Sequence, residues 1–182
     1  MKKIDIDSWK RKAHYLFFSR MDYPQFNICF DVDITEFLAK VKSRSLPFYY
    51  SMIHASTKAA DDVEEFRYRA RDGKVVLHES LTPAFTDMDR DSDLFRMVAV
   101  GMNDDIADFC AAAKVKSDSQ EEPFVAADFI GRDDYIYFTS IPWIPFTHIS
   151  HTISLNKNDS VPRLSWGKYY ERDGRILLPY SV

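Results

Sequence analysis

The sequence predicts an α+β protein in which helices pack on a large mixed β-sheet. Residues 26–33 alternate apolar and polar side chains, as a strand with one buried face does. Two Arg-Asp-Gly segments, at 71–73 and 172–174, each lie between runs of strand-forming residues. Because an Asp-Gly pair readily adopts positive φ angles, both segments indicate tight β-hairpin turns.

Two helices are expected near the start of the chain. Residues 8–19 form the first, with Ser8 as a polar N-terminal cap. The second begins after the strand at 26–33, where Asp33 caps it and Glu36, three residues later, completes a capping-box pattern. Its buried face consists of four apolar residues at helical spacing: Ile34, Phe37, Leu38 and Val41.

A third helix and a hairpin follow. Pro47 begins the helix, which extends to about Asp61, because proline lacks the N–H that the first helical turn leaves unpaired in any case. The hairpin pairs residues 66–71 with residues 74–79 across the first Asp-Gly turn.

Most of the remaining chain is expected to form strands. A helix spans 104–114, and the charged and polar residues 115–122 are expected to form a loop. The last hairpin lies within 166–182, and its second run, 176–182, is a strand that enters the core. The further strands are expected at 83–89, 94–101, 134–140, 146–153 and 162–170.

Composition limits the class of protein. The 182 residues are 46% hydrophobic and 15% aromatic, which suits a single packed domain, 1–182, with a substantial core. A net charge of −4 with mixed signs argues against nucleic acid or a membrane as partner, and no apolar run approaches the roughly 20 residues that span a bilayer. Two cysteines and a start without an apolar leader suit a reducing compartment. We therefore expect a soluble cytoplasmic domain.

The residues alone show no catalytic or metal-binding motif. There is no glycine-rich phosphate loop, and no serine is flanked by the glycines of a nucleophile elbow. His148 and His151 lie in the strand expected at 146–153 and would face opposite sides of it, so they make a poor metal pair. Nothing local orients His151 as a base. Each histidine is therefore interpreted as exposed or structural.

Three motifs, in order along the chain, carry a family resemblance. They are WxRxxHxxxF at 9–18, a Pro-Trp pair at 142–143 followed by Phe146, and GKYY at 167–170. Longer stretches, among them FDVDITEFLAKVK and FYYSMIHAS, extend the similarity over almost the whole length. In these motifs the chain resembles the type A chloramphenicol acetyltransferases.

The resemblance implies a coenzyme A-dependent acyltransferase fold and an antibiotic-resistance activity that uses no metal. In this family, acetyl-CoA donates an acetyl group to a hydroxyl of chloramphenicol or a related small molecule. A catalytic histidine removes the proton of the acceptor hydroxyl, whose oxygen attacks the thioester directly. The family works as a homotrimer with active sites at the subunit interfaces. The expected partners are thus acetyl-CoA, a small hydroxyl acceptor and further copies of the chain.

Two site residues carried over from the family are catalytic, and a third supports them. Thr139, four residues before Trp143, takes the place of a serine that stabilises the oxyanion, and it keeps the hydroxyl donor. Arg11 matches the arginine that pairs with the aspartate of the family motif HHxxxDG. Ser165, three residues before Lys168, matches a pocket threonine that holds water and supports the oxyanion.

Five further residues fall where the family binds its acceptor. Phe17, Phe95 and Phe129 match the apolar lining of the drug pocket. Phe18 stands where many members have a tyrosine that contacts the drug, and Asp22 stands where an apolar residue is usual. A buried, unpaired carboxylate is costly, so Asp22 favours another hydroxyl-bearing acceptor, for instance a cationic one.

The motif HHxxxDG is absent from the sequence. We expect a chain truncated at its C-terminus, in which these 182 residues transfer no acetyl group without the missing segment. Two alternatives stay open. One is a shortened, inactive relative that binds a ligand or only assembles, and the other is a different enzyme that recruits His148 or His151.

Overall fold

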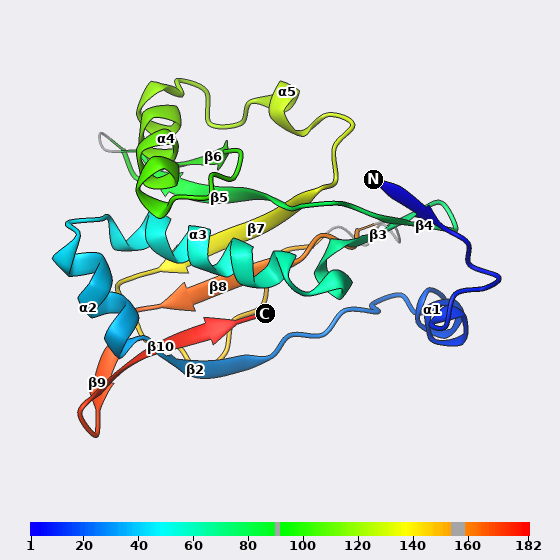
Figure 1. Ribbon diagram of the computed structural model, residues 1–182, viewed down its shortest axis with the longest axis horizontal. Coiled ribbons are helices and arrows are strands. Elements are labelled where there is room, and N and C mark those ends of the chain that lie inside the picture. Colours follow the sequence, from blue (N-terminus) through cyan, green and yellow to red (C-terminus); the bar gives the residue numbers. More distant parts are fainter. Residues whose placement is uncertain (90–91, 154–158) are drawn as a thin grey trace.

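Helices cover one face of a large mixed β-sheet, which confirms the predicted α+β class (Figure 1). The computed structural model describes residues 1–89, 92–153 and 159–182. Within these ranges the large sheet has seven strands: β2 (Cys29–Asp33), β5 (Thr82–Met88), β6 (Phe95–Ala99), β7 (Tyr135–Ile141), β8 (Arg163–Gly167), β9 (Tyr170–Arg172) and β10 (Arg175–Ser181).

The strand order places the last strand in the interior of this sheet. From one edge the order is β2-β10-β8-β7-β5-β6, and β9 pairs with β10 off this path. β7 runs parallel to both β5 and β8, while the other pairs are antiparallel. β2 pairs with β10, so that Cys29 lies opposite Ser181 and Asp33 opposite Leu177.

A smaller sheet has the order β1-β4-β3 and consists of β1 (Lys2–Ile4), β4 (Lys74–Leu77) and β3 (Tyr68–Arg71). Its hairpin turn has φ angles of 47° at Asp72 and 76° at Gly73, and the turn before β10 has 52° at Asp173 and 73° at Gly174. Positive φ at both central residues matches the twist of the flanking strands. Both predicted Asp-Gly hairpins are therefore confirmed, whereas β1 was not predicted.

The helices in the described ranges are α1 (Lys12–Phe18), α2 (Thr35–Ser43), α3 (Phe48–Asp61), α4 (Ile106–Ser119) and α5 (Ala126–Phe129), with a 3₁₀ turn at Glu64–Arg67. The third predicted helix is confirmed as α3, but Pro47 is its N-cap and lies one position before the first helical turn in which it was predicted. At α2 the capping box is wrong, because Asp33 Oδ1 instead accepts from the backbone and the hydroxyl of Thr35, at 3.0 and 2.6 Å. No helix in this part of the chain is long and apolar enough to cross a lipid bilayer.

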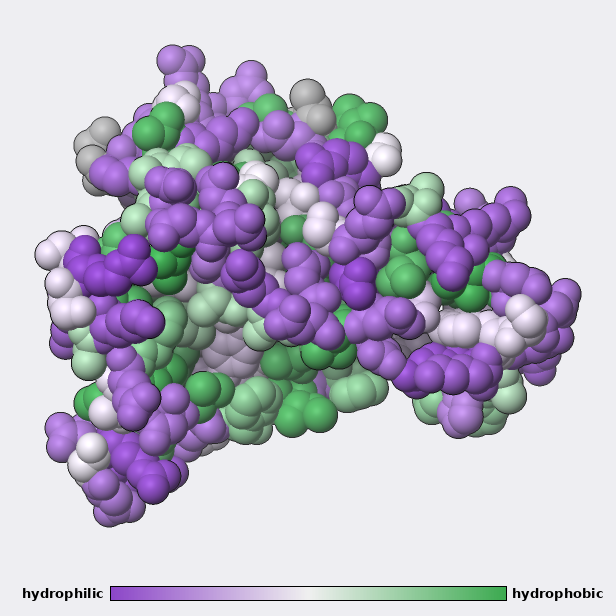
Figure 2. Space-filling model, in the orientation of Figure 1, coloured by the Kyte–Doolittle hydropathy of each residue, from purple (hydrophilic) through white to green (hydrophobic). Residues whose placement is uncertain are grey.

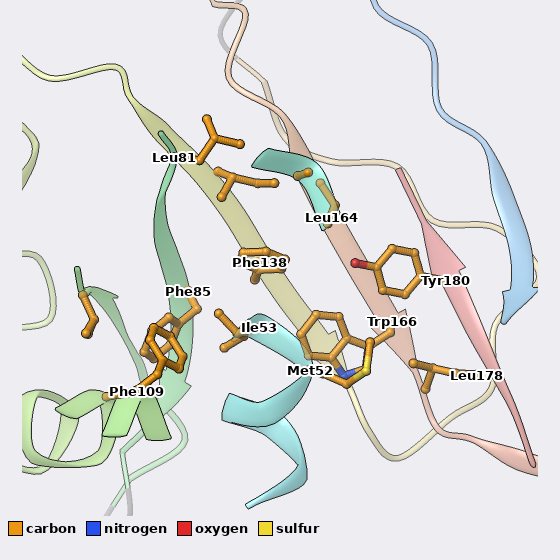
Figure 3. Packing of buried hydrophobic residues seen from close by; sticks show 14 of the residues in the cluster. Met52, Ile53, Leu81, Phe85, Phe109, Phe138, Leu164, Trp166, Leu178 and Tyr180 are labelled. Carbon is orange, nitrogen blue, oxygen red and sulfur yellow. The ribbon is translucent and has the colours of Figure 1, made fainter. Parts of the chain in front are cut away.

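The hydrophobic core lies between α3 and the centre of the sheet (Figure 3). Ile53 of α3 is buried among strand residues such as Phe138. The rings of Trp166 and Tyr180, on neighbouring strands, stack with centroids 6.1 Å apart, and the Tyr180 hydroxyl donates to Ser56 Oγ of α3 at 2.7 Å. These contacts define the helix-covered face of the sheet.

Two helix boundaries differ from the prediction. Ser8 Oγ donates to Asp5 Oδ2 at 2.8 Å instead of capping a helix, and α1 begins only at Lys12. Residues 115–119 continue α4, because buried Ser117 donates from its hydroxyl to Asp87 Oδ2 at 2.7 Å and anchors this last turn. The polar composition of 115–119 thus reflects a helix with an exposed face, where a loop was predicted.

Residues 146–153 do not form the predicted strand. β8 is already flanked by β7 and β10 within the sheet. The segment therefore finds no free strand edge beside β8, and it crosses the sheet as irregular backbone. The argument that His148 and His151 face opposite sides of one strand does not hold in the structure.

Arg69 joins the small sheet to the large one. Its side chain is buried and donates to four backbone carbonyls, including Asp133 O at 2.5 Å and Tyr135 O at 2.6 Å. Burial lowers the pKa of Arg69 to about 10, so the guanidinium stays charged at neutral pH. The carbonyls satisfy the donors that burial removes from water, which makes the buried charge tolerable.

An exposed apolar row, here called the row of β2, lies along the free edge strand β2 and the residues just before it. Phe26, Ile28 and Phe30 have exposed fractions of 82%, 55% and 47%. Phe30 is paired with Tyr180 and therefore projects from the helix-covered face, but no helix of the described chain covers it. Figure 2 shows apolar surface along the lower edge of the molecule, where β2 lies in Figure 1.

Candidate active site

Three hydroxyl side chains form a row across the sheet, here called the hydroxyl row: Thr139 of β7, Ser165 of β8 and Ser181 of β10. Thr139 is in register with Ser165, and Ser165 with Ser181. Residues that pair across strands project from the same face, and their neighbours Trp166 and Tyr180 face α3. The hydroxyl row therefore projects from the face that α3 does not cover.

A cavity of 460 Å³, here called the His151 cavity, lies at the beginning of β8. Its walls come from 23–28, from 65–66, from the crossing segments at 150–153 and 160–163, and from Val182. Inside it, His151 Nε2 lies 3.3 Å from Ser165 Oγ. Burial, together with the nearby Arg163 charge, lowers the pKa of His151, so its imidazole is neutral at neutral pH.

The charged residues that line the His151 cavity are paired. Arg163 Nη2 lies 2.7 Å from Asp159 Oδ2 in a half-buried ion pair, and its guanidinium also lies over the Tyr137 ring, 5.7 Å from the centroid. Glu65 forms an ion pair with Arg11. The cavity therefore presents compensated charges along a largely neutral wall.

A second cavity, of 470 Å³ and here called the Trp143 cavity, lies at the end of β8. Aromatic side chains make much of its wall: Phe48, Tyr49, Trp143, Trp166 and Tyr169. Lys168 contributes a cation, and Asp87 contributes a carboxylate that accepts from the Tyr50 hydroxyl at 2.5 Å. The wall thus combines flat apolar rings with one cation and one hydrogen-bonded carboxylate.

Gly167 lets the backbone close the Trp143 cavity. The Lys168 N–H donates to Ile144 O at 2.8 Å, which holds the 142–146 segment against the end of β8. A Cβ at Gly167 would lie 2.8 Å from the same carbonyl oxygen and 3.0 Å from Phe146 Cδ1. Only glycine permits this approach, which gives a physical reason for the glycine of the GKYY motif.

Three residues were predicted to catalyse the transfer or to support catalysis, and the structure brings two of them together. Thr139 and Ser165 are in register on neighbouring strands, and both belong to the hydroxyl row. Arg11 lies elsewhere, in its ion pair with Glu65 at the rim of the His151 cavity.

The five residues predicted to bind the acceptor are dispersed within one chain. Phe17 and Phe18 are exposed on α1 and contact each other edge to face, and Asp22 is exposed beyond that helix. Phe95 packs on Phe124, and Phe129 of α5 packs on the Tyr135 ring. None of the five lines either cavity in the described part of the chain. Their predicted roles therefore rest on the family resemblance and not on either cavity.

Sequence reasoning missed the contact between His151 and Ser165. The two residues are brought together by an irregular segment whose path no periodicity predicts. His148 diverges from His151 and lies with Nδ1 3.9 Å from Cys29 Sγ. Among the described residues, no group of three histidine, cysteine or acidic side chains is arranged to hold a metal ion.

Comparisons with known proteins point to one family. The family model described as chloramphenicol acetyltransferase matches residues 1–182. A chloramphenicol acetyltransferase of Klebsiella sp is 26% identical over 181 residues, which cover 98% of this chain and 82% of that protein. Chloramphenicol acetyltransferase 2 of Haemophilus influenzae is 24% identical, with 99% and 85% covered.

Solved structures agree with this similarity. A chloramphenicol acetyltransferase superposes with a TM-score of 0.88 at 27% identity, covering 98% of this chain and 88% of that one. The dihydrolipoamide acetyltransferase of Azotobacter vinelandii superposes with a TM-score of 0.64 at 16% identity, covering 93% and 76%. At that identity the second likeness shows a shared fold alone.

Proposed function

The chain belongs to the chloramphenicol acetyltransferase family, and we propose that it serves the transfer of an acetyl group from acetyl-CoA to a hydroxyl of chloramphenicol or a related small molecule. One observation carries this proposal. The two cavities lie at opposite ends of β8, and Ser165 of β8, which is in register with Thr139, lies beside His151 of the first cavity. A two-substrate transfer needs two binding spaces and a polar group near the reacting atoms.

We assign acetyl-CoA to the Trp143 cavity. Coenzyme A combines an anionic phosphate end with a long, uncharged arm. Lys168 supplies a cation for phosphate, and the rings of Trp143 and Tyr169 supply flat apolar surface. The His151 cavity, with its paired charges, then takes the acceptor.

The proposed chemistry is general-base catalysis with direct transfer. An imidazole takes the proton of the acceptor hydroxyl as its oxygen attacks the thioester carbon, and the coenzyme A thiolate leaves. The Thr139 hydroxyl donates to the oxyanion, and Ser165 supports it. We assign the imidazole to the family motif HHxxxDG, which does not occur in residues 1–182, and Arg11 to the aspartate of that motif.

We further propose that these 182 residues function as part of a homotrimer. The exposed apolar row of β2 lies on a free sheet edge, and such an edge needs cover. If each site forms between subunits, Phe17, Phe18, Asp22, Phe95 and Phe129 reach it from a neighbouring copy.

The experiment compares two proteins: residues 1–182, and the same chain extended after Val182 by a family-type tail that contains HHxxxDG. Release of coenzyme A thiol from acetyl-CoA is measured with chloramphenicol and a panel of other hydroxyl acceptors. We expect acceptor-dependent release from the extended chain alone, because losing the base and its positioning removes most of the rate. Binding of acceptor without transfer by either protein would favour a binding or assembly module. Release by residues 1–182 that His151→Ala abolishes would favour an enzyme that uses His151 as base.

A further inference from the structure

His151 has a fixed position in its cavity, although it lies in an irregular segment. Its Nε2 is 3.3 Å from Ser165 Oγ, and Ser165 is completely buried in β8. Ser165 is paired on both sides, with Thr139 of β7 and Ser181 of β10. Ser181 in turn accepts a hydrogen bond from Asn27 Nδ2 at 2.7 Å. The serine is therefore a rigid anchor for the ring.

The contact with Ser165 occupies one ring nitrogen. A neutral imidazole has one donor and one acceptor nitrogen, and a serine hydroxyl can serve either of them. Within the described ranges, Ser165 is the only hydrogen-bonding partner found for the His151 ring. Because burial and Arg163 lower the pKa of His151, the second nitrogen, Nδ1, belongs to an uncharged ring.

The surroundings of His151 suit a neutral ligand. The cations near the cavity are already paired, Arg163 with Asp159 and Arg11 with Glu65. The sequence predicted a cationic acceptor from the carboxylate of Asp22, but Asp22 does not line this cavity. A cation entering the cavity would have to break an existing ion pair to gain a partner.

We propose that His151 is the residue by which this cavity selects its acceptor: held by Ser165, it offers Nδ1 to a hydrogen-bonding group of a neutral hydroxyl compound. This inference rests on the proposed function, because it takes the His151 cavity as the acceptor site. His151 acts here in binding, and the base of the transfer step remains the imidazole assigned above.

The test uses chloramphenicol, an uncharged molecule with two hydroxyl groups, and isothermal titration calorimetry on residues 1–182. We expect His151→Leu to raise the Kd roughly 3- to 10-fold, the effect of losing one hydrogen bond. His151→Asn, whose amide lies near the place of Nδ1, should recover at least half of that loss. His148→Leu is the matched control, since His148 is an exposed histidine of the same segment that does not line the cavity, and it should leave Kd unchanged.

The anchor is tested by a double-mutant cycle. Ser165→Ala should raise the Kd by itself but add less than about 2-fold in the His151→Leu background, because the two residues act through one contact. Thermal unfolding of each variant shows that it folds. Additive effects of the two substitutions on Kd would contradict the anchoring of His151 by Ser165. A His151→Leu variant that binds chloramphenicol as tightly as the wild type, or more tightly, would overturn the role of His151 but not the assignment of the cavity to the acceptor.

Two further outcomes separate this inference from the proposed function. If wild-type residues 1–182 bind no chloramphenicol, the assignment of the cavity to the acceptor fails together with the role of His151.

The preference for a neutral ligand is tested with the deacylated amine of chloramphenicol, which keeps both hydroxyls but carries a positive charge. We expect it to bind at least 10-fold more weakly than chloramphenicol, and tighter binding would contradict selection for a neutral acceptor.

Discussion

Thr139 carries a methyl group in addition to the hydroxyl that the proposed oxyanion site requires. In the chain extended by the family tail, Thr139→Ala should lower turnover by roughly 10²- to 10³-fold with little change in KM, because an oxyanion donor acts only in the transition state. Thr139→Ser keeps the donor and should retain most of the activity. Steady-state kinetics measure both, and normal turnover by the alanine variant would show that the oxyanion lies elsewhere.

Gly167 and Gly101 differ in the space around them, so substitutions at the two positions make a test and its control. In Gly167→Ala the new Cβ would lie 2.8 Å from Ile144 O, so the 142–146 segment must move. We expect a loss of about 1–3 kcal/mol in the free energy of unfolding and weaker acetyl-CoA binding. Gly101→Ala places its Cβ where no atom lies within 4 Å and should change neither. Urea unfolding and calorimetry compare the two variants.

Among single residues, only part of the candidate site could be predicted. The adjacency of Thr139 and Ser165 follows from strand register, and the family motifs indicated both residues. The contact of His151 with Ser165 depends on a crossing segment without periodicity, so no pattern in the sequence predicts it. The same holds for Arg11 and Glu65, whose ion pair depends on how the 3₁₀ turn at Glu64–Arg67 meets the start of α1.

At the scale of elements, turn and proline signals were the most reliable. Pro47 and the two Asp-Gly pairs act through their own backbone preferences, and the structure confirms the elements they begin or join. The strand predicted at 146–153 failed because the sheet has no open position beside β8. β1 is a short edge strand, whose existence depends on a partner and not on its own three residues.

The contact between the small sheet and the residues just before β7 should respond to pH through Asp133. The Arg71 hydrogen bond is the main cause that holds the pKa of Asp133 below 3.8, against the effect of burial, and His78 Nε2 lies 2.8 Å from the same carboxylate. The folded pKa is therefore below the unfolded one. The resulting stability is fully present above about pH 4 and is lost as the pH falls through the folded pKa.

Asp133→Asn tests this reasoning. At pH 7 the substitution should lower the free energy of unfolding by about 1–3 kcal/mol, since it removes a hydrogen-bonded carboxylate. The difference from wild type should shrink between about pH 4 and pH 2. Asp104→Asn is the control, because its carboxylate is fully exposed and lies 3.5 Å from Lys58. A difference that stays constant down to pH 2 would show that Asp133 does not titrate in this contact.

At the scale of the whole molecule, the proposed homotrimer can be tested directly. We expect light scattering at micromolar concentration to give the mass of a trimer. Phe26→Asp, in the exposed row of β2, should weaken assembly, because it buries a charge in the proposed contact. Val115→Asp changes an equally apolar, exposed residue on α4, which lies away from β2 in Figure 1, and should leave the mass unchanged. A monomer in wild type would contradict the assignment, and measurement on the tail-extended chain would show whether the tail contributes to assembly.

The pairing of β2 with β10 has a consequence for biosynthesis. β2 emerges from the ribosome about 140 residues before β10, which is its only partner in the described sheet. At roughly 5–20 residues per second, the nascent chain holds β2 and its apolar row unpaired for on the order of ten seconds. The pairing of β2 must therefore wait until β10 has been made, and the yield of folded protein should depend on chaperones and on growth temperature during that interval.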